Sequence, residues 1–178
     1  NAALPAHRTM VELLYPGDII AASLQALTPG LSYTTMSATE LWRVPSAAMR
    51  IEMSSDAAFA DAVFQRLNMQ RARMQLHITM LAGLPSEQRV AGLLLQAAYR
   101  LGTNTMGAIS FDMPLSRNEV AEYLALNADT LSRIMSRLRQ SGIFSPYDRL
   151  RAVVPDWNAL ISLSPAAVSL TELHAAHL

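Results

Sequence analysis

The residues of this sequence whose types and spacing suit chemistry are polar side chains between residues 115 and 144. At helical spacing, one outward face would carry an acid, a hydroxyl group and arginines: Asp129, Ser132, Arg133, Arg137 and Arg139. An arginine can donate two hydrogen bonds to guanine, a carboxylate can accept one from cytosine, and a serine can serve either base. The chemistry that this face indicates is the reading of DNA bases.

Two short helices joined by a tight turn must position these side chains. Ser116 and Glu119 form an S-x-x-E capping box at the start of the first helix. The pattern breaks at residues 125–127, where Asn127 can cap the second helix. Apolar residues at helical spacing would face inward: Val120, Ala121, Leu124, Leu131, Ile134, Met135 and Leu138. We therefore predict a helix-turn-helix, the motif whose second helix enters the major groove.

Composition limits the class of protein. The chain has 178 residues, 51% of them hydrophobic and 16% charged, which suits one or two globular domains. No apolar run approaches the roughly 20 residues that span a bilayer, and no signal peptide opens the sequence, so we expect no membrane partner and a cytoplasmic location. The net charge is zero, but residues 114–151 hold six arginines against four acids, a local excess of +2. This modest excess favours contact with phosphates.

Residues that commonly carry catalysis or hold metal ions form no recognisable set. The absence of cysteine excludes disulfides and cysteine-ligated clusters within these residues. The four histidines are scattered without zinc spacing: His7, His77, His174 and His177. No nucleophile with its base, phosphate loop or pair of carboxylates is evident, so we expect no enzyme activity.

The first 48 residues have the pattern of β structure. Turns at 16–18 and 28–30 separate apolar runs, and residues 39–44 are predicted to form a short strand before Pro45. This region is too short for a closed sheet, so we expect further residues upstream of it.

Residues 54–82 have the pattern of one long helix. A heptad repeat runs through it at Ala60, Leu67, Met74 and Leu81, with companions three residues on at Val63, Gln70 and His77. A second apolar stripe lies beside the first: Phe59, Phe64, Leu76 and Ile78. One stripe can cover the β region while the other meets a partner helix, with Gln70 and His77 setting the register of a dimer. The alternative is an ordinary amphipathic helix packed within one chain.

The remaining elements flank the helix-turn-helix. A helix from residue 86 to Gly102 and a linker or short strand at 103–113 precede it. After it we predict strands at 142–144 and 150–154 around a turn at 145–148, a helix at 156–163 and a weakly patterned tail.

This combination of a turn-rich β region, a long helical spine and a C-terminal winged helix-turn-helix resembles the CRP/FNR superfamily of bacterial transcription regulators. The resemblance covers residues 8–160, and its most specific part is RNEVAEYLALNADTLSRIMSRL. It implies an α+β fold in three parts: a partial cyclic-nucleotide-binding-type β-barrel at 1–53, a long dimerisation helix at 54–83 and a winged helix-turn-helix DNA-binding domain at 84–178. It also implies a homodimer that binds double-stranded DNA at a palindrome of the TTGAT…ATCAA kind and works with RNA polymerase.

The resemblance assigns DNA contacts to seven residues. Asp129, Ser132 and Arg133 fall at the base-reading positions of the family. Phosphate or backbone contacts fall on the others: Arg117, Thr130, Asn118 and Arg137.

Two positions depart from the family pattern. Ala125 stands where glycine is usual, which costs roughly 1 kcal/mol if that residue is left-handed. Asp129 replaces the usual glutamate and is one methylene shorter, which puts its base contact in doubt. An acid in a first helical turn also suits the helix dipole, so Asp129 has a structural explanation beside the base-reading one.

The signal that such a regulator would answer to is not evident. Residues 21–34 align with the cyclic-nucleotide cassette but contain neither glutamate nor arginine, so cyclic AMP is not expected to bind. Iron–sulfur sensing lacks its ligands within these residues. Haem would have His7, Met74 and His77 as candidates, although lone histidines rarely ligate without a supporting shell. The cofactor is therefore unknown, with haem, an iron–sulfur cluster, a small molecule or none as alternatives.

A second class of function stays open beside DNA binding. Glu119, Glu122 and Asp129 place acids on the helix-turn-helix. The alternative is therefore a ligand-sensing or protein-interaction module whose winged helix contacts protein rather than DNA.

Overall fold

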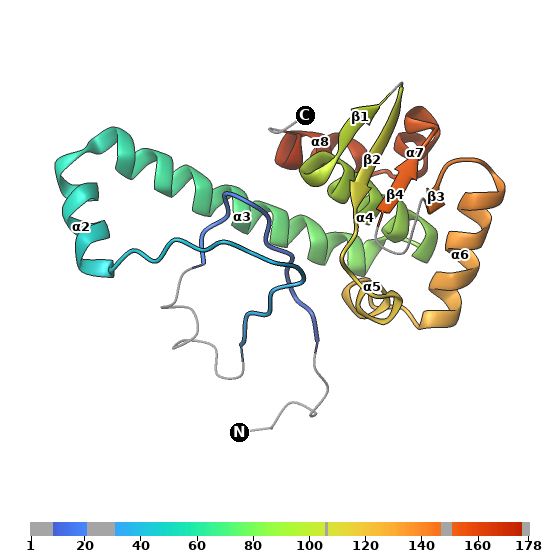
Figure 1. Ribbon diagram of the computed structural model, residues 1–178, viewed down its shortest axis with the longest axis horizontal. Helices are drawn as coiled ribbons and strands as arrows, with labels where there is room; N and C mark the ends of the chain where they lie inside the picture. The colour runs from blue at the N-terminus through green and yellow to red at the C-terminus, as the bar shows by residue number, and fades with distance from the viewer. Residues whose placement is uncertain (1–8, 21–30, 106, 147–150, 176–178) are drawn as a thin grey trace. The chain divides into compact units, whose positions relative to one another are not determined.

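The computed structural model describes residues 9–20, 31–105, 107–146 and 151–175, and divides the chain into two compact units (Figure 1). One unit is Leu14–Ala72, and the other joins Asn1–Leu13 to Arg73–Leu178. The α+β class with a C-terminal helix-turn-helix is confirmed. No helix among the described residues is both long and apolar enough to cross a bilayer.

The unit Leu14–Ala72 begins with the turn expected at 16–18. The Asp18 backbone N–H donates to the Tyr15 carbonyl at 3.0 Å, the Asp18 carboxylate accepts the Tyr15 N–H at 2.9 Å, and Gly17 takes a φ of 84°. A left-handed residue in a tight turn favours glycine because it has no Cβ. The turn chemistry at this position is therefore confirmed.

The strand predicted at 39–44 is wrong. This segment pairs with no other strand among the described residues, and its Trp42 side chain is 89% exposed. Helix α2, Ser46–Ser55, follows at once, although β pattern was expected to residue 48. Pro45 stands at the N-cap of α2, where its fixed φ and missing N–H are tolerated. An extended segment does not form a strand without a neighbouring strand to exchange backbone hydrogen bonds with.

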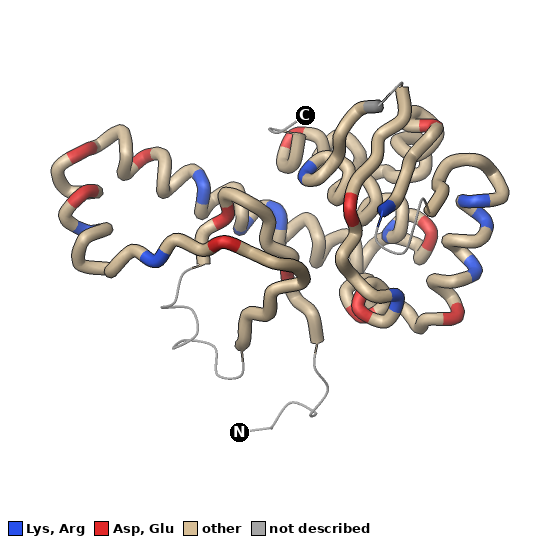
Figure 2. The backbone as a smooth tube through the Cα atoms, viewed as in Figure 1, with Lys and Arg blue, Asp and Glu red and all other residues tan. Residues whose placement is uncertain are grey.

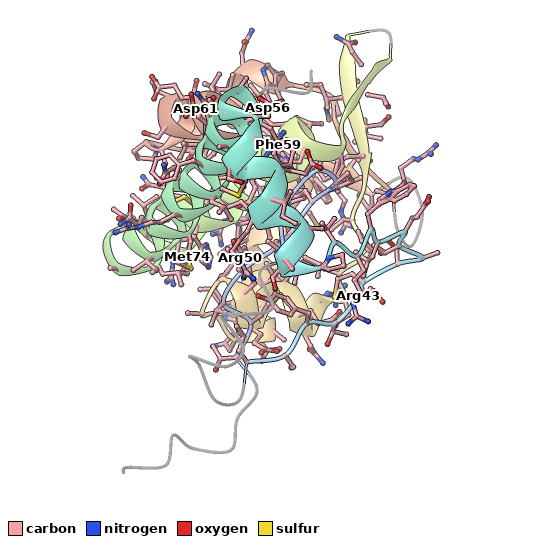
Figure 3. All side chains as sticks on the ribbon, turned by 90° about the vertical axis from the view of Figure 1, so that its left-hand side faces the viewer. Arg43, Arg50, Asp56, Phe59, Asp61 and Met74 are labelled. Carbon is pink, nitrogen blue, oxygen red and sulfur yellow. The ribbon has the colours of Figure 1, made fainter. Side chains whose placement is uncertain are left out.

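Helix α3, Ala57–Gly83, is the predicted long helix, and it starts three residues later than expected. Asp56 ends α2 and caps α3, because its carboxylate accepts the Phe59 N–H at 3.0 Å. Figure 3 shows Asp56, Phe59 and Asp61 together at this start of α3. Acids at a helix N-terminus are favoured by the helix dipole.

Gln70 and His77 are buried with partners inside their own chain, which the heptad pattern did not predict, and their role in setting a dimer register stays a prediction. The Gln70 amide donates to the Ile19 carbonyl at 3.1 Å and accepts the Ile19 N–H at 2.9 Å. His77 is buried against Tyr123 within its own unit. Both polar groups pack inside one chain because each finds a backbone or ring partner there.

The unit that contains residues 73–178 is built around α4, Ser86–Leu101, which is buried from Val90 to Arg100. Four antiparallel strands pair in the order β1-β2-β4-β3. Their bounds are Thr103–Thr105 for β1, Ala108–Asp112 for β2, Ser145–Pro146 for β3 and Arg151–Val154 for β4. Helices α5, Arg117–Tyr123, and α6, Ala128–Gln140, lie between β2 and β3 in the chain. Figure 1 shows α6 at the edge of this unit. The α4 core therefore supports the helix that carries the candidate contacts.

The elements around the helix-turn-helix differ in detail from the prediction. Strands β1 and β2 pair as a hairpin within residues 103–113, so of the two alternatives predicted there, a linker or a short strand, the strand is confirmed. Strand β3 of the wing is Ser145–Pro146 instead of 142–144, and residues 147–150, which include part of the predicted turn, lie outside the described residues. The helix predicted at 156–163 is α7, Trp157–Leu163, capped by the Asp156 carboxylate.

The tail that was called weakly patterned contains α8, Ala167–His174. Its Leu170 is buried, and its Thr171 hydroxyl is hydrogen bonded to the Tyr99 hydroxyl of α4 at 2.7 Å. Two glycines permit the close packing of α4: a Cβ on Gly92 would collide with the Met80 side chain, and one on Gly102 with the Ala98 carbonyl. The C-terminal helix thus completes the core around α4.

Candidate nucleic-acid interface

The first helix of the motif starts as predicted. The Ser116 hydroxyl accepts the Glu119 N–H at 3.3 Å, and the Glu119 carboxylate accepts the Ser116 N–H at 2.8 Å. Val120, Ala121 and Leu124 are buried, as the spacing required. The capping box therefore fixes where α5 begins.

A left-handed residue ends this helix. Ala125 has a φ of 51°, the one non-glycine residue with positive φ in the described part of the chain. Its N–H donates to the Glu122 carbonyl at 3.1 Å, and the Leu126 N–H donates to the Ala121 carbonyl at 2.8 Å. This is the Schellman pairing, which glycine usually closes. With a Cβ present, the turn holds a strain of roughly 1–2 kcal/mol.

Helix α6 is capped and anchored as expected. The Asn127 side chain accepts the Thr130 N–H at 2.7 Å. Leu131, Ile134 and Leu138 are buried, and Met135 is half-buried beside them. Arg133, Arg137 and Arg139 are exposed and an acid lies in the first turn, and Figure 2 marks these basic and acidic positions along α6. The buried stripe therefore presents a charged face away from the core.

The structure places the seven candidate residues on two helices. Exposed side chains at positions i, i+4 and i+8 of α6 share one face: Asp129, Arg133 and Arg137. Thr130 and Ser132 are half-buried beside them, and the Ser132 hydroxyl donates to the Ala128 carbonyl at 2.8 Å. Arg117 and Asn118 are exposed in the first turn of α5. Their roles as DNA contacts stay predictions.

Arg137 has a partner that its helical position does not reveal. Its Nε lies 3.4 Å from the Glu87 carboxylate in the first turn of α4, and both side chains are partly exposed. A surface pair of this kind contributes at most about 1 kcal/mol and is weakened by salt. A DNA phosphate would have to compete with Glu87 for this guanidinium.

Arg151 places a positive charge on the described part of the wing. Arg151 of β4 stands directly opposite Asp112 of β2, and its Nε lies 3.4 Å from that carboxylate. The two side chains are exposed, so this pair does not bury charge. No group of three or more metal-ligating side chains occurs among the described residues.

His77 of α3 stacks flat on Tyr123 of α5, with ring centroids 3.9 Å apart and planes 6° from parallel. Burial lowers the pKa of His77 to about 4, although a hydrogen bond with the Tyr123 backbone raises it. Burial also lowers the pKa of His174 to about 3, together with the positive charges of Arg73 and Arg100. Both imidazoles are therefore neutral at pH 7.

These two histidines predict a loss of stability in mild acid. Their pKa is lower in the folded chain than the usual 6.5, so the unfolded chain binds more protons as the pH falls below 6.5. Each group should then reduce the unfolding free energy by up to about 1.4 kcal/mol per pH unit. Urea unfolding between pH 7.5 and 5.0 measures this slope. His77→Phe keeps a stacked ring without a titrating group, and an unchanged slope in this variant would contradict the assignment.

These observations define a winged helix-turn-helix: two capped helices, a left-handed turn and a paired wing strand. Residues 88–163 match the family of Crp-like helix-turn-helix domains. The chain is 28% identical over 130 residues to the nitrogen fixation regulation protein FixK of Azorhizobium caulinodans, covering 72% of this chain and 52% of that protein. Residues 88–163 therefore carry a Crp-like helix-turn-helix domain, and these similarities support membership of the CRP/FNR superfamily of transcriptional regulators.

Other relatives and solved structures agree with this membership. A probable transcriptional activator of Rhizobium leguminosarum bv. viciae is 39% identical over 75 residues, which is 42% of this chain and 31% of that protein. The structure of FixK2 from Bradyrhizobium japonicum matches with a TM-score of 0.62 over 69% of this chain and 60% of that one, at 24% identity. The chain spans between 31% and 52% of the length of these curated relatives.

Proposed function

We propose that this chain is a sequence-specific DNA-binding transcription regulator that reads a palindromic site as a homodimer. The observation that carries the proposal is the placement of exposed Asp129 and Arg133, with half-buried Ser132 between them, on a capped helix whose other side is fixed in the core. An arginine so placed can bond guanine O6 and N7 in the major groove. Arg117, Asn118, Thr130 and Arg137 would fix the register on phosphates.

An exposed apolar stripe on α3 supports the homodimer. Phe64 is 65% exposed, Leu67 39%, Met74 38% and Ile78 56%. They are three, seven and four residues apart, which places them on the seam positions of a coiled coil, with Arg71 at the one seam position between Leu67 and Met74. Apolar side chains left in water along one helix face favour association with a second copy. This stripe combines residues from both stripes predicted in the sequence. Two recognition helices would then reach half-sites about one DNA turn, roughly 34 Å, apart.

The resemblance adds the finer parts of the proposal. Residues 21–34 lack the glutamate and arginine of a cyclic-nucleotide cassette, which supports regulation without cyclic AMP. RNA polymerase is the proposed protein partner, and the cytoplasm the proposed location. The segments 1–53, 54–83 and 84–178 would serve sensing, dimerisation and DNA binding.

A protein-interaction role has less support than DNA binding. Three acids on the helix-turn-helix suggested this role. The Glu119 carboxylate, however, caps its own helix, and Glu122 is half-buried. Asp129 alone is then an exposed acid on this motif, next to Arg133 and Arg137. The charged face of α6 therefore suits an anionic partner better.

A gel-shift titration against salt tests the function. The intact protein should bind a duplex that carries the TTGAT…ATCAA palindrome, and affinity should fall steeply as salt rises from 50 to 200 mM, because each contacted phosphate releases counterions. A scrambled duplex of equal length is the control and should bind more weakly. Failure to bind either duplex at low salt would reject the proposal in favour of a protein-interaction module.

A further inference from the structure

The C-terminal end of α5 exposes carbonyl groups that need partners. The last four carbonyls of a helix have no backbone N–H within that helix to accept a hydrogen bond from. The Schellman pairing at Ala125 satisfies two of them, Ala121 and Glu122. The other two belong to Tyr123 and Leu124, and the Ala125 carbonyl follows them at the turn that leads into the recognition helix α6.

Arg89 of α4 takes two of these carbonyls. Its Nη1 donates to the Leu124 carbonyl at 2.8 Å and more weakly to the Ala125 carbonyl at 3.5 Å, while Nη2 lies 3.4 Å from the Ser86 hydroxyl. The side chain is half-buried between α4 and the turn. A charged donor to a carbonyl makes a stronger hydrogen bond than a neutral one. Arg89 therefore acts as a cap supplied from outside the helix.

His77 of α3 holds the residue before these carbonyls. Its ring lies on the Tyr123 ring, and it is hydrogen bonded to the Tyr123 backbone. Side chains of α3 and α4 thus contact the end of α5 and the turn that follows it.

We propose that Arg89 is a positioning residue for DNA reading: it holds the strained turn at Ala125 and so fixes the direction in which α6 leaves it. The inference rests on the proposed function and adds a residue that need not touch DNA. Alanine at the left-handed position costs energy that glycine would not, so this turn depends on an external hold. Arg89 stands next to that turn from a helix fixed in the core.

Hydrogen exchange in the full chain without DNA tests the hold directly. In Arg89→Met, the amides of residues 125–131 should exchange at least about tenfold faster, because a charged hydrogen bond to the turn is lost. Arg50→Met, which removes an exposed arginine of α2, is the charge-matched control and should leave these amides unchanged. Adding Ala125→Gly to Arg89→Met should restore slow exchange, since glycine takes the turn without strain.

DNA binding separates positioning from a phosphate contact. With the palindromic and scrambled duplexes, Arg89→Met should lower the specificity ratio about tenfold and leave the salt dependence unchanged. A phosphate contact would instead weaken both duplexes equally and reduce the salt slope by about one. Arg89→Lys keeps the charge but loses the planar fork, and should give an intermediate ratio even if the methionine variant folds poorly.

The outcomes distinguish the two proposals. Unchanged exchange at residues 125–131 in both Arg89 variants, or a reduced salt slope, would overturn the positioning role. If the unaltered protein binds neither duplex, the proposed function fails, while the exchange result still decides whether Arg89 holds the turn.

Discussion

Replacing Arg133 by alanine lowers affinity for the palindromic duplex by roughly 1–3 kcal/mol and relaxes the preference at one guanine. The expected loss follows from the position of the side chain. Arg133 is exposed on α6 and makes no hydrogen bond or ion pair within the described part of the chain, so its guanidinium is available to a base. Its backbone is held in a helix with a buried stripe, so truncation should not unfold α6.

Gel shifts with the palindromic duplex and with single-base variants measure this effect. Arg139→Ala is the matched control, because Arg139 is an exposed arginine of α6 that lies about 120° around the helix axis from Arg133. It should weaken binding to all duplexes alike and only slightly. An unchanged ratio between palindromic and scrambled duplexes in Arg133→Ala would show that this side chain does not read a base.

The double substitution Leu67→Glu and Ile78→Glu should convert the dimer into a monomer. Both residues lie in the exposed apolar stripe of α3, so the change should spare the fold of one chain. In a symmetric dimer each glutamate would meet its own copy nearby, and like charges placed together cost several kcal/mol. We expect the dissociation constant of the dimer to rise at least about 100-fold.

Sedimentation of the intact protein and circular dichroism together measure this outcome. DNA affinity should fall with dimerisation, because a monomer loses the high effective concentration of its second recognition helix. Gln65→Glu with Thr79→Glu places the same charges on exposed positions outside the stripe and should leave the dimer intact. A protein that is monomeric before any substitution would rule out this role for α3.

The candidate interface was predictable because its determinants are local. The capping box of Ser116 and Glu119, the Asn127 cap and the buried stripe of α6 each join residues three or four positions apart. The resemblance placed Ala125 at the turn position where glycine is usual, and the residue is left-handed, with a φ of 51°. Hydrogen bonds of this range form within a single turn, so the chain needs no distant partner to make them.

Other features could not be predicted because the partner is distant. Residues 39–44 were predicted to form a short strand, but no neighbour pairs with them in the described residues, and the chain enters α2 instead. Gln70 and His77 fit a heptad seam, but each found a partner within one chain that the heptad pattern does not contain. Helix α8 was missed because its short apolar pattern gains order only by packing on α4.

The sequence by itself determined the helix-turn-helix and the polar residues that α6 exposes, since local spacing sets both the caps and the exposed face of that helix. The tertiary structure alone decided how that face is held. Arg89 and Glu87 reach the motif across 35 and 50 residues of chain, and His77 reaches Tyr123 from another helix. Contacts at that separation depend on how α3 and α4 pack, and no residue spacing encodes them.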